Sequence, residues 1–179
     1  MSESGFMKPR VVIIPYKPQW PWIFKEEKKE VLNTLEDKAL VVEHIGSTSV
    51  PGLGAKDIVD MVVGVKDRQA AEDCRIMLES IDYTEVTPEP GHTEWFYCLG
   101  KTPGITPRFH LHLMKFPSPF FAKHILFRNY LRSNKKVRDE YYELKKRLAD
   151  KYGRDREGYT GAKTEFIERI ILIARERIL

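Results

Sequence analysis

The chain has 179 residues and a mass of 20.9 kDa, with 42% hydrophobic and 31% charged residues and a net charge of +4. This composition is ordinary for a globular protein that buries a core, so we expect one domain over residues 1–179. No apolar run approaches the roughly 20 residues of a membrane-spanning helix, and the N-terminus lacks the apolar stretch of a secretory signal. Cys74 and Cys98 form neither a zinc-binding nor a disulfide pattern. We therefore expect a cytoplasmic protein with no membrane association.

The first half of the chain alternates between helical and extended patterns. In order, it predicts a strand-like segment at 11–14, a helix over about 18–37, strands at 41–45 and 58–65, and a helix over about 67–80. Prolines fit the start of the first helix, because the first turn leaves backbone N–H groups without helical partners in any case. The second strand is almost entirely apolar, which is typical of a strand buried on both faces of a sheet.

The second half begins with extended segments and ends with helices. It predicts a strand pair at 83–86 and 93–99, a loop at 101–107, a strand at 108–114 and three helices beyond Pro119. Strict alternation along 108–114 places Arg108, His110 and His112 on one face and apolar residues on the other. Together these elements predict an α+β fold, with a mixed-sheet core over residues 11–116 followed by C-terminal helices over residues 119–179.

The loop between the strands at 41–45 and 58–65 has the composition of an anion-binding turn. Glycine lets a ligand approach the backbone closely, and successive N–H groups in such a turn can surround an anion. Three hydroxyl residues follow the glycine, and a lysine ends the loop. A Gly-Ser pair alone is more often a simple turn, but the flanking strands favour a binding role. The candidate phosphate or ligand-binding residues are Gly46, Ser47, Thr48, Ser49 and Lys56.

Asp60 is the most informative single residue, because it is a lone carboxylate inside an apolar strand. A buried carboxylate needs a cation, a lysine or a ligand to offset its desolvation. Asp60 is therefore a candidate catalytic residue and metal ligand; the alternative is a structural aspartate that caps a neighbouring loop. Asp57 is out of phase with Asp60, so we expect it at the opposite sheet face, in an exposed turn.

His110 and His112 project from one strand face, about 7 Å apart at the usual strand rise. Two imidazoles at this spacing can bind one divalent metal or contact phosphate oxygens. Arg108 extends the same face with a guanidinium suited to phosphate. The alternative is that both histidines are ordinary residues on a wet sheet face. We expect Asp60, His110 and His112 as metal ligands and Arg108 as a phosphate ligand.

Lys163 and Thr164 precede the final helical pattern. Thr164 is a candidate N-cap of that helix, and the N–H groups beyond it would favour an anion. Lys163 is a candidate phosphate ligand beside this helix start, with a plain capping role as the simpler interpretation.

These motifs resemble the GrpB family, small proteins assigned to the nucleotidyltransferase superfold. The resemblance covers nearly the whole chain, in blocks at Pro15–Pro21, Glu43–Leu53 with Lys56 and Asp60, Arg108–Leu113, Phe127–Arg132 and Tyr159–Phe166. It implies a nucleotidyltransferase-like fold more firmly than an activity. The family is also found fused to dephospho-coenzyme A kinase, where it is described as a folding accessory.

One departure from the broader superfold concerns the carboxylates. Active nucleotidyltransferases place two acids at i, i+2 on the strand after the Gly-Ser turn and a third acid on a later strand, and these hold two metals. Here Ile58 and Val62 flank Asp60 at that spacing, and the later strand carries histidines. The resemblance therefore disfavours a two-metal mechanism, whereas one divalent cation, Mg or Mn, at Asp60 and a histidine is compatible with these residues.

The leading expectation is a nucleotidyltransferase-like domain that binds a nucleotide or another phosphorylated small molecule, with enzymatic turnover left open. The alternative is a non-catalytic accessory module for a protein partner such as dephospho-coenzyme A kinase. Residues 123–156 carry twelve Lys and Arg against five Asp and Glu, and such a balance can attract nucleic acid. The interspersed acids make nucleic acid the less favoured partner.

Overall fold

The computed structural model describes residues 10–86, 95–102 and 108–177. Over these residues the element order is α1 (Trp20–Leu35), η1 (Glu36–Lys38), β1 (Val41–Ile45), η2 (Ser47–Ser49), β2 (Ile58–Val65), α2 (Arg68–Glu79), β3 (Thr84–Glu85), β4 (Trp95–Lys101), β5 (Arg108–Lys115), α3 (Pro119–Ser133), α4 (Lys135–Tyr152), α5 (Arg156–Gly161) and α6 (Thr164–Glu176). None of the described helices is long and apolar enough to cross a membrane.

The sheet is mixed, and its strands run in the order β1-β2-β5-β4-β3. β2 pairs in parallel with β5, while β1 with β2, β5 with β4 and β4 with β3 are antiparallel pairs. The register sets Asp60 on β2 opposite Ile45 on β1 and His110 on β5. The predicted α+β class is confirmed by this sheet and its surrounding helices.

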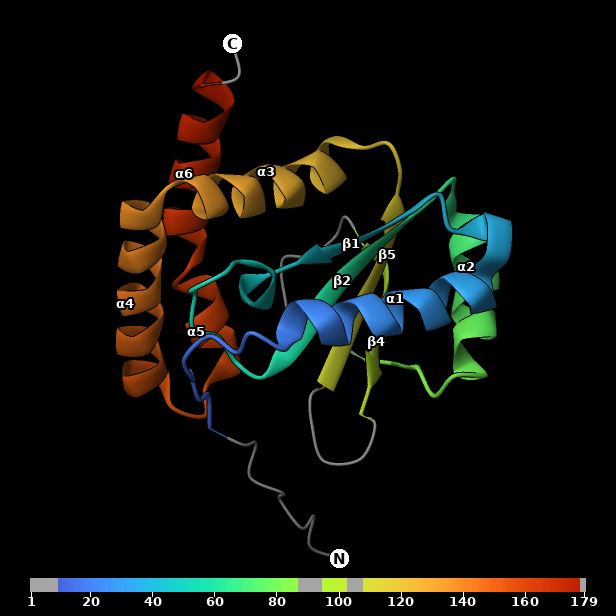
Figure 1. The fold of residues 1–179 in the computed structure, drawn as a ribbon, viewed down its shortest axis with the longest axis horizontal. Helices are drawn as coiled ribbons and strands as arrows, with labels where there is room; N and C mark the ends of the chain where they lie inside the picture. The colour runs from blue at the N-terminus through green and yellow to red at the C-terminus, as the bar shows by residue number, and fades with distance from the viewer. Residues whose placement is uncertain (1–9, 87–94, 103–107, 178–179) are drawn as a thin grey trace, which may run out of the picture.

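Helices α1 and α2 cover one face of the sheet, and α1 lies across the strands in Figure 1. Trp20, Val31 and Leu35 of α1 are fully buried in a cluster with Met61 of β2 and Leu111 of β5. These strand residues alternate with the polar residues of interest, since neighbouring side chains on a strand point to opposite faces. Asp60, His110 and His112 therefore lie on the sheet face opposite to the one that α1 covers.

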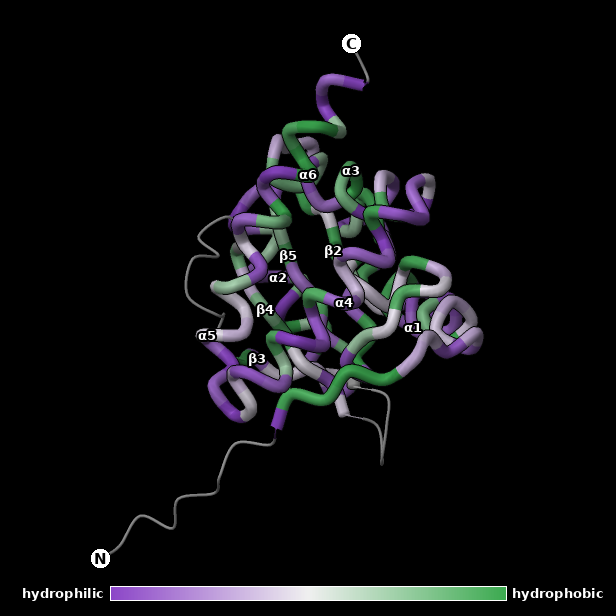
Figure 2. The backbone as a smooth tube through the Cα atoms, turned by 90° about the vertical axis from the view of Figure 1, so that its left-hand side faces the viewer, coloured by the Kyte–Doolittle hydropathy of each residue, from purple (hydrophilic) through white to green (hydrophobic). Residues whose placement is uncertain are grey.

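The C-terminal helices pack against the loop that joins β1 to β2. Val50 and Leu53 of this loop share a buried cluster with Tyr141 of α4 and with Phe166 and Ile170 of α6. Helices α4, α5 and α6 stand together on one side of the molecule in Figure 1, and α1 and α5 lie on opposite sides of the strands in Figure 2. The helical part thus holds the loop that carries Gly46 and Ser47.

Two segments differ from their predicted local structure. Val11–Ile14 does not form a strand, although Ile14 makes a single antiparallel bridge to Ala55. Lys101 ends β4 instead of starting a loop, and 87–94 and 103–107 lie outside the described residues.

The helical part beyond Pro119 contains four described helices instead of three, because the chain breaks after α4. Gly153 ends α4 with φ of +57°, a left-handed conformation that favours glycine. Asp155 then accepts a hydrogen bond from the Gly158 N–H and caps the short α5. The glycine and the capping acid close together are the sequence signal for this break.

Candidate functional site

Asp60, His110 and His112 meet on the sheet face opposite α1. The Asp60 Oδ1 lies 3.5 Å from His110 Nδ1 and 3.9 Å from His112 Nε2, and the two imidazole centroids are 6.5 Å apart. The side chains of Asp60 and His110 are 29% and 34% exposed, whereas that of His112 is 7% exposed. Parallel pairing of β2 with β5 brings these groups together, and the alternation of β5 puts both imidazoles on the Asp60 side.

The Asp60 carboxyl is held in its ionised form. Burial alone would raise the pKa of Asp60, but the contacts with His110 and His112 outweigh burial and hold that pKa well below its usual range. Because the pKa is lowered, Asp60 stays charged as the pH falls into the acidic range. The site therefore presents a permanent negative charge beside two imidazoles.

Gly46 lies directly against the Asp60 carboxylate. Its backbone has φ of +67° and ψ of −173°, a region that is essentially restricted to glycine. A Cβ at this position would lie 2.6 Å from Asp60 Oδ2. Glycine is thus required both by the turn and by the close approach of the carboxylate.

The three hydroxyl residues after Gly46 have different surroundings. Thr48 is 1% exposed with its Oγ1 3.0 Å from His44 Nε2, and Ser49 is 2% exposed with its Oγ donating to the Gly46 carbonyl. Ser47 is half-buried and accepts from the Lys145 ammonium at 2.9 Å. Thr48 and Ser49 therefore shape the turn from inside, and Ser47 is the hydroxyl of this group with an exposed share.

Lys145 of α4 is the main residue of the site that sequence reasoning missed. It is 2% exposed, and its side-chain nitrogen donates to Ser47 Oγ and to the Gly54 carbonyl, neither of which is a carboxylate. Burial, reinforced by the positive charges of Lys163 and Lys56, holds the pKa of Lys145 well below its ordinary value, and the charge of Asp60 opposes this shift. Lys145 lies in an apolar stripe of α4 between Tyr141 and Leu148. Its position in that stripe is the sequence signal that indicates a buried lysine.

Lys56 and Lys163 converge on the ring of Tyr159. Their ammonium nitrogens lie 5.7 Å and 4.4 Å from the ring centroid, within the range of a cation–π contact. Tyr159 of α5 is 1% exposed and was not singled out from the sequence. Since both lysines act electrostatically on Lys145, we name Lys56, Lys145 and Lys163 the lysine cluster.

Other predicted residues lie elsewhere or play other parts. Arg108 pairs through its backbone with Ile58, but its side chain lies outside the described residues. Asp57 is not a freely exposed turn residue, because it accepts from the Trp20 indole at 2.9 Å and from Lys17 at 2.7 Å. These partners lie on the α1 side of the sheet. Asp57 therefore lies on the face opposite to that of Asp60, as predicted.

The start of α6 also differs from the prediction. Thr164 is the first residue of α6 and is exposed, while Lys163 takes the N-cap position without a side-chain capping bond. The helix follows α5 almost without a break, so the backbone enters it in a helical conformation. That entry leaves no extended residue at which a threonine side chain could cap.

Two arginines of α3 support the turn from behind. Arg128 donates to the His44 carbonyl at 2.9 Å and to Glu43 at 2.6 Å, and Arg132 donates twice to the Ser49 carbonyl at 3.0 and 2.7 Å. These bonds fix both ends of the turn that carries Ser47. Neither arginine was singled out from the sequence.

In the stretches 10–86, 95–102 and 108–177, no three His, Cys, Asp or Glu side chains are placed to hold one metal ion.

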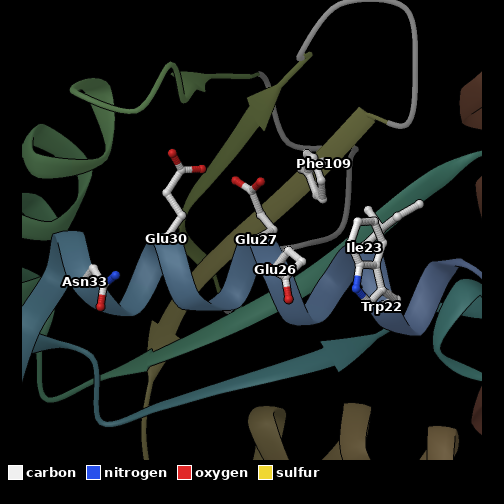
Figure 3. A pocket seen from close by; sticks show the side chains of 7 residues that line it. All are labelled: Trp22, Ile23, Glu26, Glu27, Glu30, Asn33 and Phe109. Atoms are coloured by element: carbon white, nitrogen blue, oxygen red, sulfur yellow. The ribbon is translucent and has the colours of Figure 1, made fainter.

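One hollow of about 470 Å³ lies along α1 and is lined by Trp22, Ile23, Glu26, Glu27, Glu30, Asn33 and Phe109 (Figure 3). Another of about 530 Å³ lies against α3 and Arg175. The lysine cluster lines neither hollow.

His44 makes the stability of the fold depend on pH. It is 5% exposed and stacks on Phe24 at 4.6 Å, and burial lowers the pKa of His44 to about 4 from 6.5. Because the folded pKa is below the unfolded value, the unfolded chain takes up a proton that the folded chain does not. Stability should fall by roughly 3 kcal/mol between pH 7 and pH 4.

Urea unfolding at several pH values measures this loss, with His44→Gln as the comparison. Glutamine does not titrate, so this variant should lose less stability over the same pH interval. Equal losses in both proteins would assign the acid sensitivity to other groups.

Comparisons with known proteins agree with the fold and with the motifs. The family model described as GrpB protein matches residues 10–172. A UPF0157 protein of Halalkalibacterium halodurans is 34% identical over 93% of this chain and 85% of its own length. The glutamate-rich protein GrpB of Alkalihalophilus pseudofirmus is 29% identical over 93% of this chain and 97% of its own.

A solved structure and a longer relative add to these matches. The crystal structure of GrpB from Enterococcus faecalis has a TM-score of 0.80 and 34% identity, and the match covers 93% of this chain and 99% of that chain. A dephospho-CoA kinase of Mycobacterium bovis is 27% identical over 74% of this chain, a region that makes up 38% of the kinase. By the family model, the sequence relatives and the solved structure, the chain belongs to the GrpB protein family.

Proposed function

We propose that this protein binds a nucleotide or another phosphorylated small molecule through the lysine cluster and the Gly46-Ser47 turn. The observation that carries the proposal is the contact of Lys145 with Ser47 Oγ, together with Lys56 and Lys163, which share the Tyr159 ring and act electrostatically on Lys145. Lys56 and Lys163 would hold the phosphate oxygens, and Ser47 would donate its hydroxyl. Asp60 behind Gly46 would fix the position of the turn.

The lysine cluster holds groups of like charge close together. Each of Lys56 and Lys163 disfavours the charged form of Lys145, which is already disfavoured by burial. Such an arrangement costs the folded state free energy, and a bound anion offsets that cost. Active and binding sites are where proteins retain arrangements of this kind.

A divalent cation, Mg or Mn, is a further part of this proposal. Asp60 with His110 or His112 offers two donors, and no third acid or imidazole among the described residues completes a set around one ion. Mg²⁺ is commonly bound by one or two carboxylates together with phosphates of the substrate. The residues thus fit an ion that arrives with its phosphorylated ligand better than a resident ion in a protein cage.

If the protein is an enzyme, the chemistry that suits this ligand is nucleotidyl or phosphoryl transfer. Asp60 is the candidate catalytic residue, and Arg108 is the candidate group for charge that develops on the phosphates. The divalent ion would supply charge neutralisation on the phosphates when bound. Asp60→Ala should abolish any nucleotide binding that requires Mg or Mn, and calorimetry with a nucleotide panel tests this directly.

Lys163→Met should weaken binding of inorganic phosphate and nucleotides by about 10- to 100-fold, because one charge-assisted hydrogen bond is lost. Isothermal calorimetry measures the affinity. Lys146→Met is the matched control, since Lys146 lies on α4 and pairs with Glu143 at 2.6 Å in an exposed position. Equal affinities of the Lys163→Met variant and the unchanged protein would count against the proposal.

A second proposal concerns a protein partner. The match to a region of dephospho-CoA kinase favours association with that kinase. Co-purification of the two purified proteins by size exclusion tests it. Separate elution at concentrations well above those used in the phosphate titration would argue against this partner.

A further inference from the structure

We propose that Ser47 and Lys145 form a nucleophile–base pair that transfers a phosphoryl group from a phosphate monoester onto Ser47. This inference rests on the proposed phosphate site and adds a covalent step to it. The Lys145 nitrogen lies 2.9 Å from Ser47 Oγ, a hydrogen-bond distance through which a proton can pass in either direction. Serine–lysine pairs of this kind are a known alternative to the serine–histidine arrangement.

The surroundings of Lys145 suit a base. A lysine can accept a proton only when its amine is neutral. Burial and the two neighbouring lysines favour the neutral form of Lys145. The Gly54 carbonyl accepts a second hydrogen bond from the same nitrogen and orients it toward Ser47. A Cβ at Gly54 would overlap the Tyr142 ring, so the glycine permits α4 to approach this closely.

The surroundings of Ser47 suit a nucleophile. It follows Gly46 at the sharp turn into η2, and it is the partly exposed hydroxyl next to two buried ones. The turn is fixed from both sides, by Asp60 against Gly46 and by Arg132 on the Ser49 carbonyl. The reacting oxygen is therefore held in one place without help from the ligand.

The step balances without any further reactant. Lys56 and Lys163 hold the monoester, a bond forms between Ser47 Oγ and phosphorus, and the ester P–O bond breaks. The hydroxyl proton moves to Lys145 and then to the alkoxide that leaves as an alcohol.

Mass spectrometry after incubation of the whole chain with p-nitrophenyl phosphate tests the inference. The protein should gain the mass of one phosphoryl group, located on the peptide that contains Ser47. Ser47→Ala should lose this label, whereas Ser133→Ala, which changes a hydroxyl on α3 that donates to backbone carbonyls, should keep it. Label on any residue other than Ser47, or no label at all, overturns the inference.

Two variants distinguish a catalytic role of Lys145 as a base from a purely structural role. Lys145→Met removes the base, and the labelling rate should fall by about 100- to 10,000-fold, the range of general base catalysis. Lys145→Arg keeps a cation but cannot accept a proton, so it should label as slowly as Lys145→Met while circular dichroism shows a folded protein. Labelling at the unchanged rate in Lys145→Arg refutes the role of Lys145 as base.

The same samples separate this inference from the proposed function. Phosphate binding that depends on Lys163, without label on Ser47, would refute the nucleophile–base pair and leave the binding proposal standing. Label on Ser47 without measurable phosphate binding would support the pair and refute the binding proposal.

Discussion

Lys101→Met should lower the free energy of unfolding by about 3–5 kcal/mol, the usual cost of removing one partner of a buried ion pair. Lys101 of β4 and Glu27 of α1 are each 8% exposed, and their charged atoms lie 2.9 Å apart. Lys101 also contacts Glu30 at 2.5 Å, and the Tyr83 hydroxyl donates to Glu27 at 3.0 Å. Figure 3 shows the Glu27 and Glu30 carboxylates projecting in the same direction from α1.

The cost arises from the carboxylate that remains. Burial alone would lower the pKa of Lys101, but its bonds to Glu30 and Glu27 outweigh burial and raise that pKa, so the Lys101 ammonium is charged at neutral pH. Without the ammonium, the Glu27 carboxyl group is left in a buried position with only the Tyr83 hydroxyl as a described partner. That state is what destabilises the variant.

Urea unfolding of a double-mutant cycle measures this effect. Glu27→Gln combined with Lys101→Met removes the stranded charge and should restore part of the lost stability. Lys29→Met is the control, because Lys29 pairs with Glu26 on the exposed side of α1, where ion pairs contribute little. A loss below about 1 kcal/mol in Lys101→Met would show that the pair adds little to the fold.

Patterns within single segments predicted the central strands and one half of the site. The alternation of 108–114 and the apolar run of β2 were enough to place His110, His112 and Asp60 on one face, because strand periodicity decides the face of every residue once register is set. The family signature around Gly46 then located the turn beside them. These features depend on neighbours in sequence or on the adjacent strand.

The other half of the site depends on contacts between distant segments. Lys145 meets Ser47 across 98 positions of sequence, and Lys101 meets Glu27 across 74. A lysine on a charged helix is most often solvated, so composition alone gives no reason to bury it. Only the docking of α4 on the β1–β2 loop decides that Lys145 is buried.

Gly46→Ala should both destabilise the fold by roughly 2–6 kcal/mol and weaken phosphate binding. The backbone conformation at Gly46 costs a residue with a Cβ about 1–3 kcal/mol, and overpacking against Asp60 adds a similar amount. The carboxylate Oδ2 would lie 2.6 Å from the new Cβ, so Asp60 has to move away from the turn. Urea unfolding and phosphate calorimetry measure the two effects.

A second glycine separates the contact from the backbone. Gly153 also has a positive φ, +57°, but a Cβ there meets no atom within 4 Å. Gly153→Ala should therefore show a backbone cost alone and leave phosphate binding unchanged. Adding Asp60→Ala to Gly46→Ala should recover the part of the stability loss that exceeds the Gly153→Ala cost. If the Gly46 and Gly153 variants lose equal stability and both bind phosphate normally, the turn and the carboxylate are not coupled, because the close approach of Asp60 would then have no energetic consequence.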